Sequence, residues 1–332
     1  MNIKNEHINA IIGIVVIGRN EGQRLLLSLQ SMQESKCPIV YVDSGSSDNS
    51  LEIARPLVSC LHQLDSSTLF SAARARNEGF QKITELFPTL EYVQFVDGDS
   101  EVIEGWISEA AIFLSKNLQV AIVSGILSER FPEKTIYNKL CDLEWKLPYG
   151  EVKACGGNAM MRVSAFKQVK GYLPSLVAGE EPEMCVRLRQ NGWKVWHLNC
   201  AMMLHDADMV FFRQWWKRTM RGGYAFAEGA FLHGKAPEFH WVAESRRAWL
   251  WGAIIPLIAV LAFFIKPVCS LLLLLLYPLQ LLRLVLNSRL PIKMAFYQAL
   301  FLIIGKFAEM AGQIKFLIHH IKRNKDKVVV CK

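Results

Sequence analysis

The 332-residue sequence lacks paired cysteines, a secretion signal and the interleaved basic and aromatic residues of a nucleic-acid-binding module. Its 8 cysteines are scattered without a Cys-x-x-Cys pair, which excludes a compact disulfide framework and indicates reduced thiols in a cytosolic domain. Residues 1–10 carry one Lys and one Glu and lack the apolar core and cleavage site of a signal peptide. We therefore expect residues 1–10 to form a tail and the N-terminal domain to stay in the cytoplasm.

Charged residues are also scarce between residues 248 and 286, where Lys266 and Arg283 are the only ones. The overall mean hydropathy of +0.19 is high for a soluble enzyme, and this stretch is where the apolar excess lies. Residues 248–265 and 268–286 each approach the roughly 20 residues that cross a bilayer, and Lys266-Pro267 separates them. Because basic residues flank both outer ends, the positive-inside rule predicts a transmembrane hairpin with both ends in the cytoplasm. These flanking residues are Arg246, Arg247, Arg283, Arg289 and Lys293.

The formal net charge of +8 comes largely from Arg and Lys after residue 213, beside the apolar stretch. This position favours anionic membrane lipids and lipid-linked phosphates as partners, and no nucleic acid. Residues 209–231 predict an amphipathic helix rich in Trp and Arg, which suits a membrane interface or a helix packed on the preceding domain. Residues 294–320 are apolar but interrupted by charges, which predicts an interfacial helix, with a third span as the alternative. Residues 321–332 form a basic tail.

Before this region, apolar runs alternate with helical patterns. The predicted strands are residues 11–17, 39–42, 61–64 and 92–96, and the predicted helices are residues 23–32, 51–57 and 71–87. Strands that alternate with helices of this length predict an α/β fold with a doubly wound, mostly parallel sheet. We expect this domain to cover residues 11–233, followed by a linker at 234–247.

The strand at 92–96 ends directly at Asp97-Gly98-Asp99. Ligands bind at the carboxyl ends of the strands in open α/β sheets, and side chains at i and i+2 of an extended segment share a face. Two carboxylates so placed suit Mn²⁺ or Mg²⁺, which proteins hold with carboxylates and substrate phosphates. An Asp-Gly turn without a metal is the structural alternative.

A later segment, Gly179-Glu180-Glu181-Pro182-Glu183, opens a predicted helix that ends at Asn191-Gly192. Acidic residues at a helix start are stabilised by the helix dipole, so a purely structural role for these glutamates stays open at this point. The same applies to His205, at the end of a predicted strand over residues 194–204, where a structural histidine is the alternative to a metal ligand.

Five stretches occur in one order: GRNE, VDSGSSDNS, ARARNEG, VDGDS and GEEPEMCVRLRQNGW. This order resembles family 2 glycosyltransferases of the GT-A-type fold, in a membrane-anchored bacterial type with a GEEPE motif. These are inverting enzymes that use nucleotide-diphosphate sugars, and their sheet is a doubly wound mixed sheet. The resemblance implies that Arg19, Asn20, Glu21, Asp43, Arg76, Asp97 and Gly157 contact the nucleotide sugar. It also implies that Asp97, Asp99 and, less directly, His205 hold the metal.

An inverting transfer needs a carboxylate that takes the proton of the acceptor hydroxyl and a divalent metal that neutralises the departing diphosphate. The family residue is usually the Asp of a Glu-Asp pair, and the matching position here is Glu181, which leaves the base open between Glu181 and Glu180. The resemblance implies an enzyme of polysaccharide biosynthesis in the inner cell membrane, with a lipid-linked or other glycan acceptor.

Two other classes remain as alternatives. A nucleotidyltransferase would need a glycine-rich phosphate loop with a nearby lysine, whereas GRNEG has only Gly18 and Gly22. A non-catalytic membrane scaffold with a transferase-like domain is expected to have lost an acid among Asp43, Asp97, Asp99 and Glu181, and all four are present. The run Gln214-Trp215-Trp216-Lys217-Arg218 departs from the QxxRW motif of processive synthases, which argues against processive polymerisation.

Overall fold

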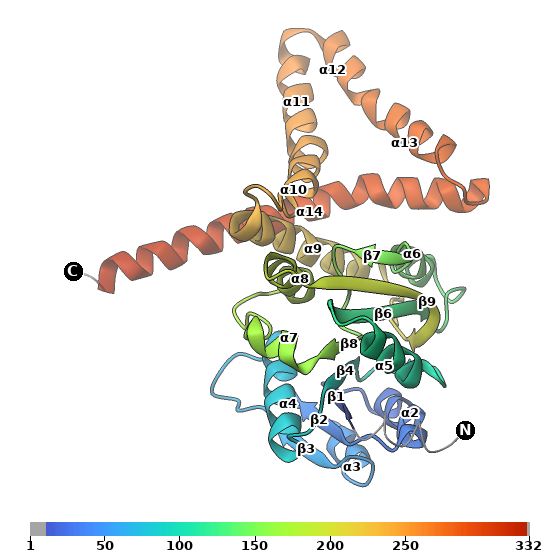
Figure 1. Ribbon diagram of the computed structural model, residues 1–332. Coiled ribbons are helices and arrows are strands. Elements are labelled where there is room, and N and C mark those ends of the chain that lie inside the picture. The colour runs from blue at the N-terminus through green and yellow to red at the C-terminus, as the bar shows by residue number, and fades with distance from the viewer. Residues whose placement is uncertain (1–10, 331–332) are drawn as a thin grey trace. The chain divides into compact units, whose positions relative to one another are not determined.

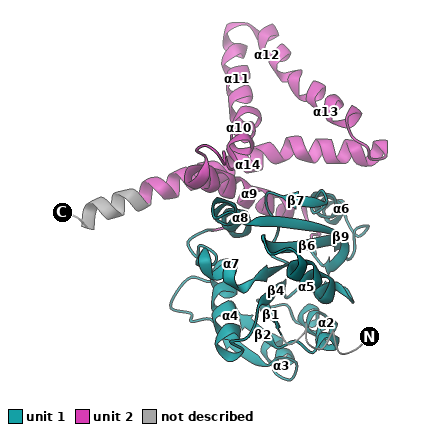
Figure 2. Cartoon of the chain, in the orientation of Figure 1, with its two compact units in different colours: residues 1–176, 180–208 teal, residues 177–179, 209–332 magenta. Residues whose placement is uncertain are grey.

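The computed structural model describes residues 11–330, with side chains up to residue 322, so the predicted N-terminal tail lies outside the described residues. The chain forms two compact units, coloured separately in Figure 2. The first runs up to Leu176 and from Glu180 to Asp208, and the second comprises Val177–Gly179 and the chain from Met209 onward. Each unit is described by itself.

Unit 1 is built around one 9-stranded sheet with the strand order β3-β2-β1-β4-β8-β6-β9-β5, and β7 pairs with β9 (Figure 1). The strands are β1 (Ile12–Gly18), β2 (Ile39–Asp43), β3 (Cys60–Gln63), β4 (Tyr92–Asp97), β5 (Ser100–Val102), β6 (Val120–Glu129), β7 (Gly150–Val152), β8 (Ala159–Arg162) and β9 (Lys194–His205). The helices are α2 (Gln23–Ser31), η1 (Gln33–Ser35), α3 (Ser50–Ala54), α4 (Ala72–Leu86), α5 (Trp106–Lys116), α6 (Ile136–Glu144), α7 (Val163–Gln168) and α8 (Glu180–Gln190).

The expectation of a mostly parallel sheet is correct for the first half, whereas the second half combines one parallel pair, β6 with β9, with antiparallel pairs. Strands β3, β2, β1 and β4 are mutually parallel, as their alternation with helices predicts. Strand β8 instead runs antiparallel to both β4 and β6, and β5 and β7 run antiparallel to β9. The sheet is therefore mixed, as the resemblance to GT-A-type enzymes implied.

Alternating side chains of the strands build two apolar cores, one on each face of the sheet. On one face Val15 and Val40 pack with residues of α4, α7 and α8. On the other face Ile14 and Tyr41 pack with residues of α2 and α5. Both faces are covered, so the polar side chains of the functional region lie at the strand ends, in the loops that follow them and on α4 and α8.

Unit 2 is helical, with α9 (Phe212–His233), α10 (Val242–Trp249), the π-helix η2 (Leu250–Ile254), α11 (Ile255–Ile265), α12 (Pro267–Leu274), α13 (Leu276–Leu286) and α14 (Ile292–Val330). Helices α9 and α14 cross at very short range because glycines lie at the crossing. A Cβ on Gly223 would collide with the backbone of Glu309, and a Cβ on Gly312 would collide with that of Met220. This packing fixes α9 within the C-terminal helical unit.

Three predicted boundaries change as a result. The units divide at Asp208 and Met209 instead of at residue 233, because α9 packs along α14. The predicted linker at 234–247 contains the start of α10, which is held to α14 by a hydrogen bond from Ser245 Oγ to Gln313 Oε1 at 2.7 Å. The predicted basic tail is not separate either, since α14 continues to Val330. No glycine or proline follows Gly312 to end that helix.

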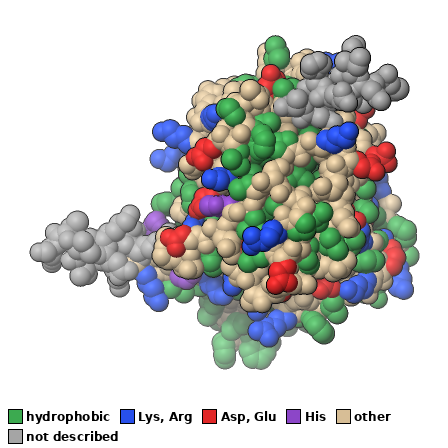
Figure 3. Space-filling model, turned by 90° about the horizontal axis from the view of Figure 1, so that it is seen from below, with side chains coloured by type: hydrophobic (Ala, Val, Ile, Leu, Met, Phe, Trp, Pro, Cys, Tyr) green, Lys and Arg blue, Asp and Glu red, His purple; other side chains and the backbone are tan. Residues whose placement is uncertain are grey.

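Two helices among the described residues are long and apolar enough to cross a membrane, Val242–Ile265 and Pro267–Leu286. They agree with the predicted hairpin, and Pro267 begins the second one at its first position. Large apolar side chains are exposed all along them, among them Phe264, Ile265 and Leu272. By contrast, the face of the molecule in Figure 3 carries basic and acidic side chains interspersed among apolar ones. Helix α14 does not meet the same criterion, so the predicted interfacial helix stays a prediction.

Candidate active site

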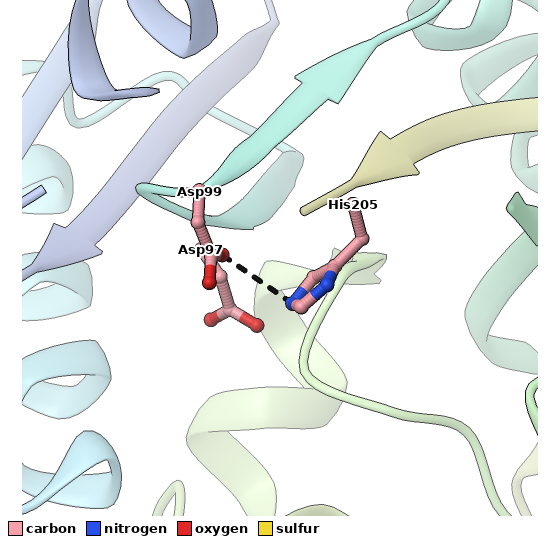
Figure 4. A group of neighbouring side chains, drawn as sticks. All are labelled: Asp97, Asp99 and His205. Carbon is pink, nitrogen blue, oxygen red and sulfur yellow. Dashed lines mark ion pairs between the residues drawn. The ribbon is translucent and has the colours of Figure 1, made fainter. Parts of the chain in front are cut away.

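Three potential metal ligands converge at the carboxyl ends of β4 and β9. Asp97 is the last residue of β4, Asp99 lies between β4 and β5, and His205 is the last residue of β9. Strand β5 pairs with β9 so that Ser100 lies opposite His205, which brings the histidine to the acid pair. One ligand atom from each residue lies within 4.8 Å of the others, and the side chains point toward one another in Figure 4.

Electrostatics at this cluster favour a cation. Burial, followed by the negative charge of Asp97, raises the pKa of Asp99 to about 7. Asp99 Oδ1 is buried without a hydrogen bond, and His205 Nε2 lies 3.4 Å from it. Carboxylate oxygens and an imidazole nitrogen are a donor set that suits Mn²⁺, and a bound cation would compensate the acidic charge. The residues present therefore fit a divalent metal, and the roles of Asp97, Asp99 and His205 as its ligands stay a prediction.

Asn158 orients the acid pair, and the sequence analysis did not assign it a role. The Asp97 backbone N–H donates to Asn158 Oδ1 at 2.9 Å, and Asn158 Nδ2 donates to Ser100 Oγ at 3.2 Å. The antiparallel pairing of β8 with β4 places Asn158, which precedes β8, at this position. The adjacent glycine pair, Gly156 and Gly157, was the only sequence signal for this segment.

Arg76 on α4 joins the acid pair to the predicted base. Its Nη2 donates to Asp97 Oδ1 at 2.8 Å, and its Nη1 lies 3.0 Å from Glu180 Oε1 and 2.9 Å from Glu181 Oε1. Only 4% of the side chain is exposed. Gly157 lies against this group, since a Cβ there would collide with the Arg76 guanidinium. The structure thus brings Arg76, Asp97 and Gly157, which were predicted to contact the nucleotide sugar, together with the two candidate bases Glu180 and Glu181.

The two candidate bases lie at the N-terminus of α8. Burial is the main cause that raises the pKa of Glu181 to about 7, and the neighbouring Glu180 raises it further, while Arg76 lowers it. A carboxyl group with a pKa near 7 suits general base catalysis at neutral pH. Glu183, by contrast, forms an ion pair with Arg187 at 2.7 Å, one helical turn further on.

The loop after β1 is bound to the loop after β2. Asn20 adopts a positive φ of 58°, its N–H donates to Ser46 Oγ at 2.9 Å, and its Oδ1 accepts from the Ser47 N–H at 2.7 Å. Arg19 lies over the Phe70 ring, with its guanidinium carbon 5.5 Å from the ring centre. Arg19 and Asn20 therefore lie at the carboxyl ends of β1 and β2, the position at which the sequence analysis expected them to contact a nucleotide.

Glu21, which was predicted to contact the nucleotide sugar, lies beside the acid pair Asp97 and Asp99. Burial raises the pKa of Glu21 to about 7, and Asp99 and Asp97 raise it further, whereas its ion pair with Arg24 at 2.7 Å lowers it. Gly98 permits this approach, since a Cβ there would lie 3.2 Å from Glu21 Cγ. Glu21 thus adds a third acidic group beside Asp97 and Asp99.

Asp43 is completely buried, with 0% of its surface exposed, and its own loop fills its acceptor positions. Oδ2 accepts from the N–H groups of Gly45 and Ser46 at 2.9 and 2.8 Å. Oδ1 accepts from the hydroxyl groups of Ser46 and Tyr41. A carboxylate has about four lone-pair positions, so these four bonds leave none for the nucleobase in this conformation. The predicted hydrogen bond to the base is therefore not supported by this geometry, because the carboxylate organises the loop instead.

The chain as a whole is similar to known proteins in sequence and in fold. The chain is similar to the succinoglycan biosynthesis protein ExoA of Rhizobium meliloti (strain 1021), with 25% identity over 208 residues, or 58% of this chain. The chain spans 62% of the length of that relative. Among solved structures, it is similar to the mannosyltransferase PcManGT from Pyrobaculum calidifontis in complex with GDP-Man and Mn²⁺. The TM-score is 0.59 at 19% identity, over 92% of this chain and 87% of that one.

The similarity to the mannosyltransferase shows the fold, a GT-A-like mixed sheet of the kind that the sequence predicted. The family comparison adds a match in sequence. Residues 13–170 match the model of glycosyl transferase family 2, and this range contains Asp43, Arg76, Asp97, Asp99 and Gly157. Residues 13–170 therefore match glycosyl transferase family 2 in sequence, and the mixed sheet matches the fold of a known glycosyltransferase.

Proposed function

We propose that the protein is an inverting glycosyltransferase that moves a sugar from a nucleotide-diphosphate sugar to a lipid-linked glycan acceptor at the membrane. The observation that carries this proposal is the convergence of Asp97, Asp99 and His205 beside the Arg76–Glu181 pair, within a family 2 domain. PcManGT, which has a similar fold, binds GDP-Man and Mn²⁺, and this supports the proposed classes of donor and metal.

In this mechanism Glu181 accepts the proton of the acceptor hydroxyl, and the acceptor oxygen forms a bond to the anomeric carbon. The bond between that carbon and the diphosphate oxygen breaks, and the nucleoside diphosphate leaves with the electron pair. Asp97, Asp99 and His205 would hold Mn²⁺ or Mg²⁺, which supplies positive charge for the leaving diphosphate. Arg19 and Asn20 are proposed to contact the nucleotide, and Glu21 to add a third acidic group beside the metal-binding acid pair.

The acceptor and the location are inferred from unit 2. The helices Val242–Ile265 and Pro267–Leu286 are proposed to span the membrane, with the family 2 domain in the cytoplasm. An enzyme attached in this way meets lipid-linked acceptors and anionic lipids at the same surface. Its relative ExoA is a succinoglycan biosynthesis protein, which supports a role in polysaccharide biosynthesis of the cell envelope.

One experiment tests the reaction. Detergent-solubilised full-length protein is titrated with a panel of nucleotide sugars in the presence of Mn²⁺, and sugar transfer to lipid extracts is then measured. We expect saturable binding of one donor and transfer that stops when the metal is chelated. If no donor binds, or if transfer continues at full rate in excess chelator, the proposed metal-dependent reaction is wrong.

A second experiment tests the topology. A reporter fused after Asn287 should report the cytoplasm, and one inserted at Lys266-Pro267 should report the opposite side of the membrane. The same side for both reporters would contradict the hairpin.

A further inference from the structure

Arg76 carries one positive charge among three carboxylates from two other elements of the fold. Asp97 ends β4, whereas Glu180 and Glu181 begin α8. Both terminal nitrogens of the guanidinium are engaged, with Nη2 on Asp97 and Nη1 on the two glutamates. The remaining donor, Nε, is buried and has no hydrogen-bond partner. The Tyr172 ring lies against the guanidinium, with its centre 5.6 Å from the central carbon.

This arrangement differs from that of an arginine whose role is to bind a phosphate group of a ligand. Such a residue needs terminal donors that are free or exposed, whereas those of Arg76 are buried and already bound to protein acids. A planar guanidinium has a rigid two-ended geometry that a lysine does not have, so it can fix the distance between two carboxylates. Here the two carboxylates are the proposed base, Glu181, and the metal-side acid, Asp97.

We propose, relying on the function proposed above, that Arg76 is a positioning residue that holds Glu181 at a fixed distance from Asp97 and does not contact the nucleotide sugar. This distance matters because it sets where the proposed base lies relative to the acceptor hydroxyl group. A general base must lie within roughly 2.6–3.2 Å of the hydroxyl group that it deprotonates. Displacement by about 1 Å costs about 10²-fold in rate.

Gly157 leaves the space that the Arg76–Glu181 pair occupies. A Cβ at position 157 would lie 2.9 Å from Glu181 Oε1 and would collide with the Arg76 guanidinium. A Cβ at the neighbouring Gly156 would meet nothing within 4 Å, and neither glycine has a positive φ. The two positions therefore allow a matched comparison. An alanine at position 157 displaces the Arg76–Glu181 pair, whereas an alanine at position 156 does not.

The main test compares Arg76→Met and Arg76→Lys with Arg74→Met. Arg74 lies on the same helix but pairs with Glu78 at 2.7 Å, away from the acid cluster. We expect Arg76→Met to lower kcat about 10²-fold while the Kd for the nucleotide sugar stays within about threefold of wild type. Arg76→Lys keeps the charge without the two-ended geometry and should fall in between, and Arg74→Met should keep the wild-type kcat. Weaker donor binding at an unchanged kcat would overturn the positioning role in favour of nucleotide contact.

A second readout separates positioning from misfolding. Mn²⁺ binding to each full-length variant, without donor, is measured by electron paramagnetic resonance. Arg76→Met removes a positive charge beside Asp97, so Mn²⁺ should bind as tightly as in wild type or more tightly. Weaker Mn²⁺ binding would contradict the inference, because it would mean that the variant has lost the site itself.

The glycine pair provides a test that keeps every charge. Gly157→Ala should lower kcat about 10²-fold, whereas Gly156→Ala should leave it unchanged. Equal activity of both variants would overturn the inference. A wild-type protein that transfers no sugar would refute the proposed function and this inference with it, whereas active wild type beside Arg76→Met with unchanged kcat would refute the positioning role alone.

Discussion

Asp43 ends β2 and Asp99 follows β4 in the same sheet, yet the two acids lie in opposite environments. Asp43 is completely buried, but four donors from its own loop and from Tyr41 surround it. Asp99 is half-buried, with one buried oxygen that accepts no hydrogen bond, and Asp97 lies beside it. The comparison teaches that burial alone does not identify a functional acid. An acid whose oxygens are bound by its own backbone stabilises the fold, whereas one buried against other acids costs free energy and is retained for chemistry.

Glu181 belongs with Asp99 in this comparison. Its pKa is also raised to about 7, by burial and by Glu180, and its compensation comes from a single shared guanidinium. The acid cluster therefore stores unfavourable electrostatic free energy that the loop around Asp43 does not. Four predictions sharpen or break this distinction.

The largest effect is expected from Asp99→Asn. This variant keeps the size of the side chain and removes one negative charge from the acid cluster, so it should lose about 10³-fold or more in transfer. Its free energy of unfolding should be equal to or higher than that of wild type, since like-charge repulsion decreases. Sugar-transfer assays and urea unfolding in detergent measure both. Normal turnover, or a clear loss of stability, would place Asp99 with Asp43 as a structural acid.

The second-largest effect on the transfer rate is expected from Glu181→Gln. The amide cannot accept the proton of the hydroxyl group, so turnover should fall by about 10²–10⁴-fold while donor affinity changes little. Glu180→Gln should be milder, because Glu180 acts on the site through charge and helix-start stabilisation. Glu181→Asp restores the usual family residue and should keep partial activity. Steady-state kinetics of the three variants show which glutamate is the general base. An inactive Glu180→Gln variant together with a normally active Glu181→Gln variant would assign the base to Glu180.

The pH dependence of the rate should follow Glu181. Only the ionised carboxylate accepts a proton, and its pKa of about 7 means that kcat/KM should fall about tenfold per unit below pH 7. Glu180 raises this pKa, so Glu180→Gln should move the acidic limb of the profile to lower pH. The profiles are measured at saturating Mn²⁺, because bound metal keeps the metal-binding acids ionised. An acidic limb that stays in place in Glu180→Gln would show that another group titrates.

The smallest effect on the rate is expected at Asp43. Asp43→Asn places an amide among donors, so it should lower the free energy of unfolding by about 1–3 kcal/mol with little change in kcat. Asp65 is a matched control, because it accepts bonds from Ser67 in a similar turn but is exposed. Asp65→Asn should stay within about 0.5 kcal/mol of wild type. Chemical unfolding curves compare the two, and an Asp43→Asn variant of normal stability with weak donor binding would restore the predicted nucleobase contact.

Much of this molecule was predictable because local patterns determine it. The alternation of apolar runs and helices along residues 11–96 predicted the parallel half of the sheet, and the strand that ends at Asp97 predicted the acid pair. The length and composition of residues 248–286 predicted the two apolar helices. Each of these signals is contained within a few neighbouring residues, since hydrophobic periodicity and strand ends are read directly along the chain.

Other features were decided only by tertiary structure. Arg76 and Glu180 are 104 residues apart, and Asp97 and Asn158 are 61 apart, so nothing local in the sequence indicates their hydrogen bonds. The antiparallel strand β8 and the crossing of α9 with α14 at glycines likewise depend on which distant segment each element meets. The sequence by itself determined which acids stand at the strand ends. The tertiary structure decided which of them are compensated, because hydrogen-bond donors and a buried guanidinium reach them only in the folded chain.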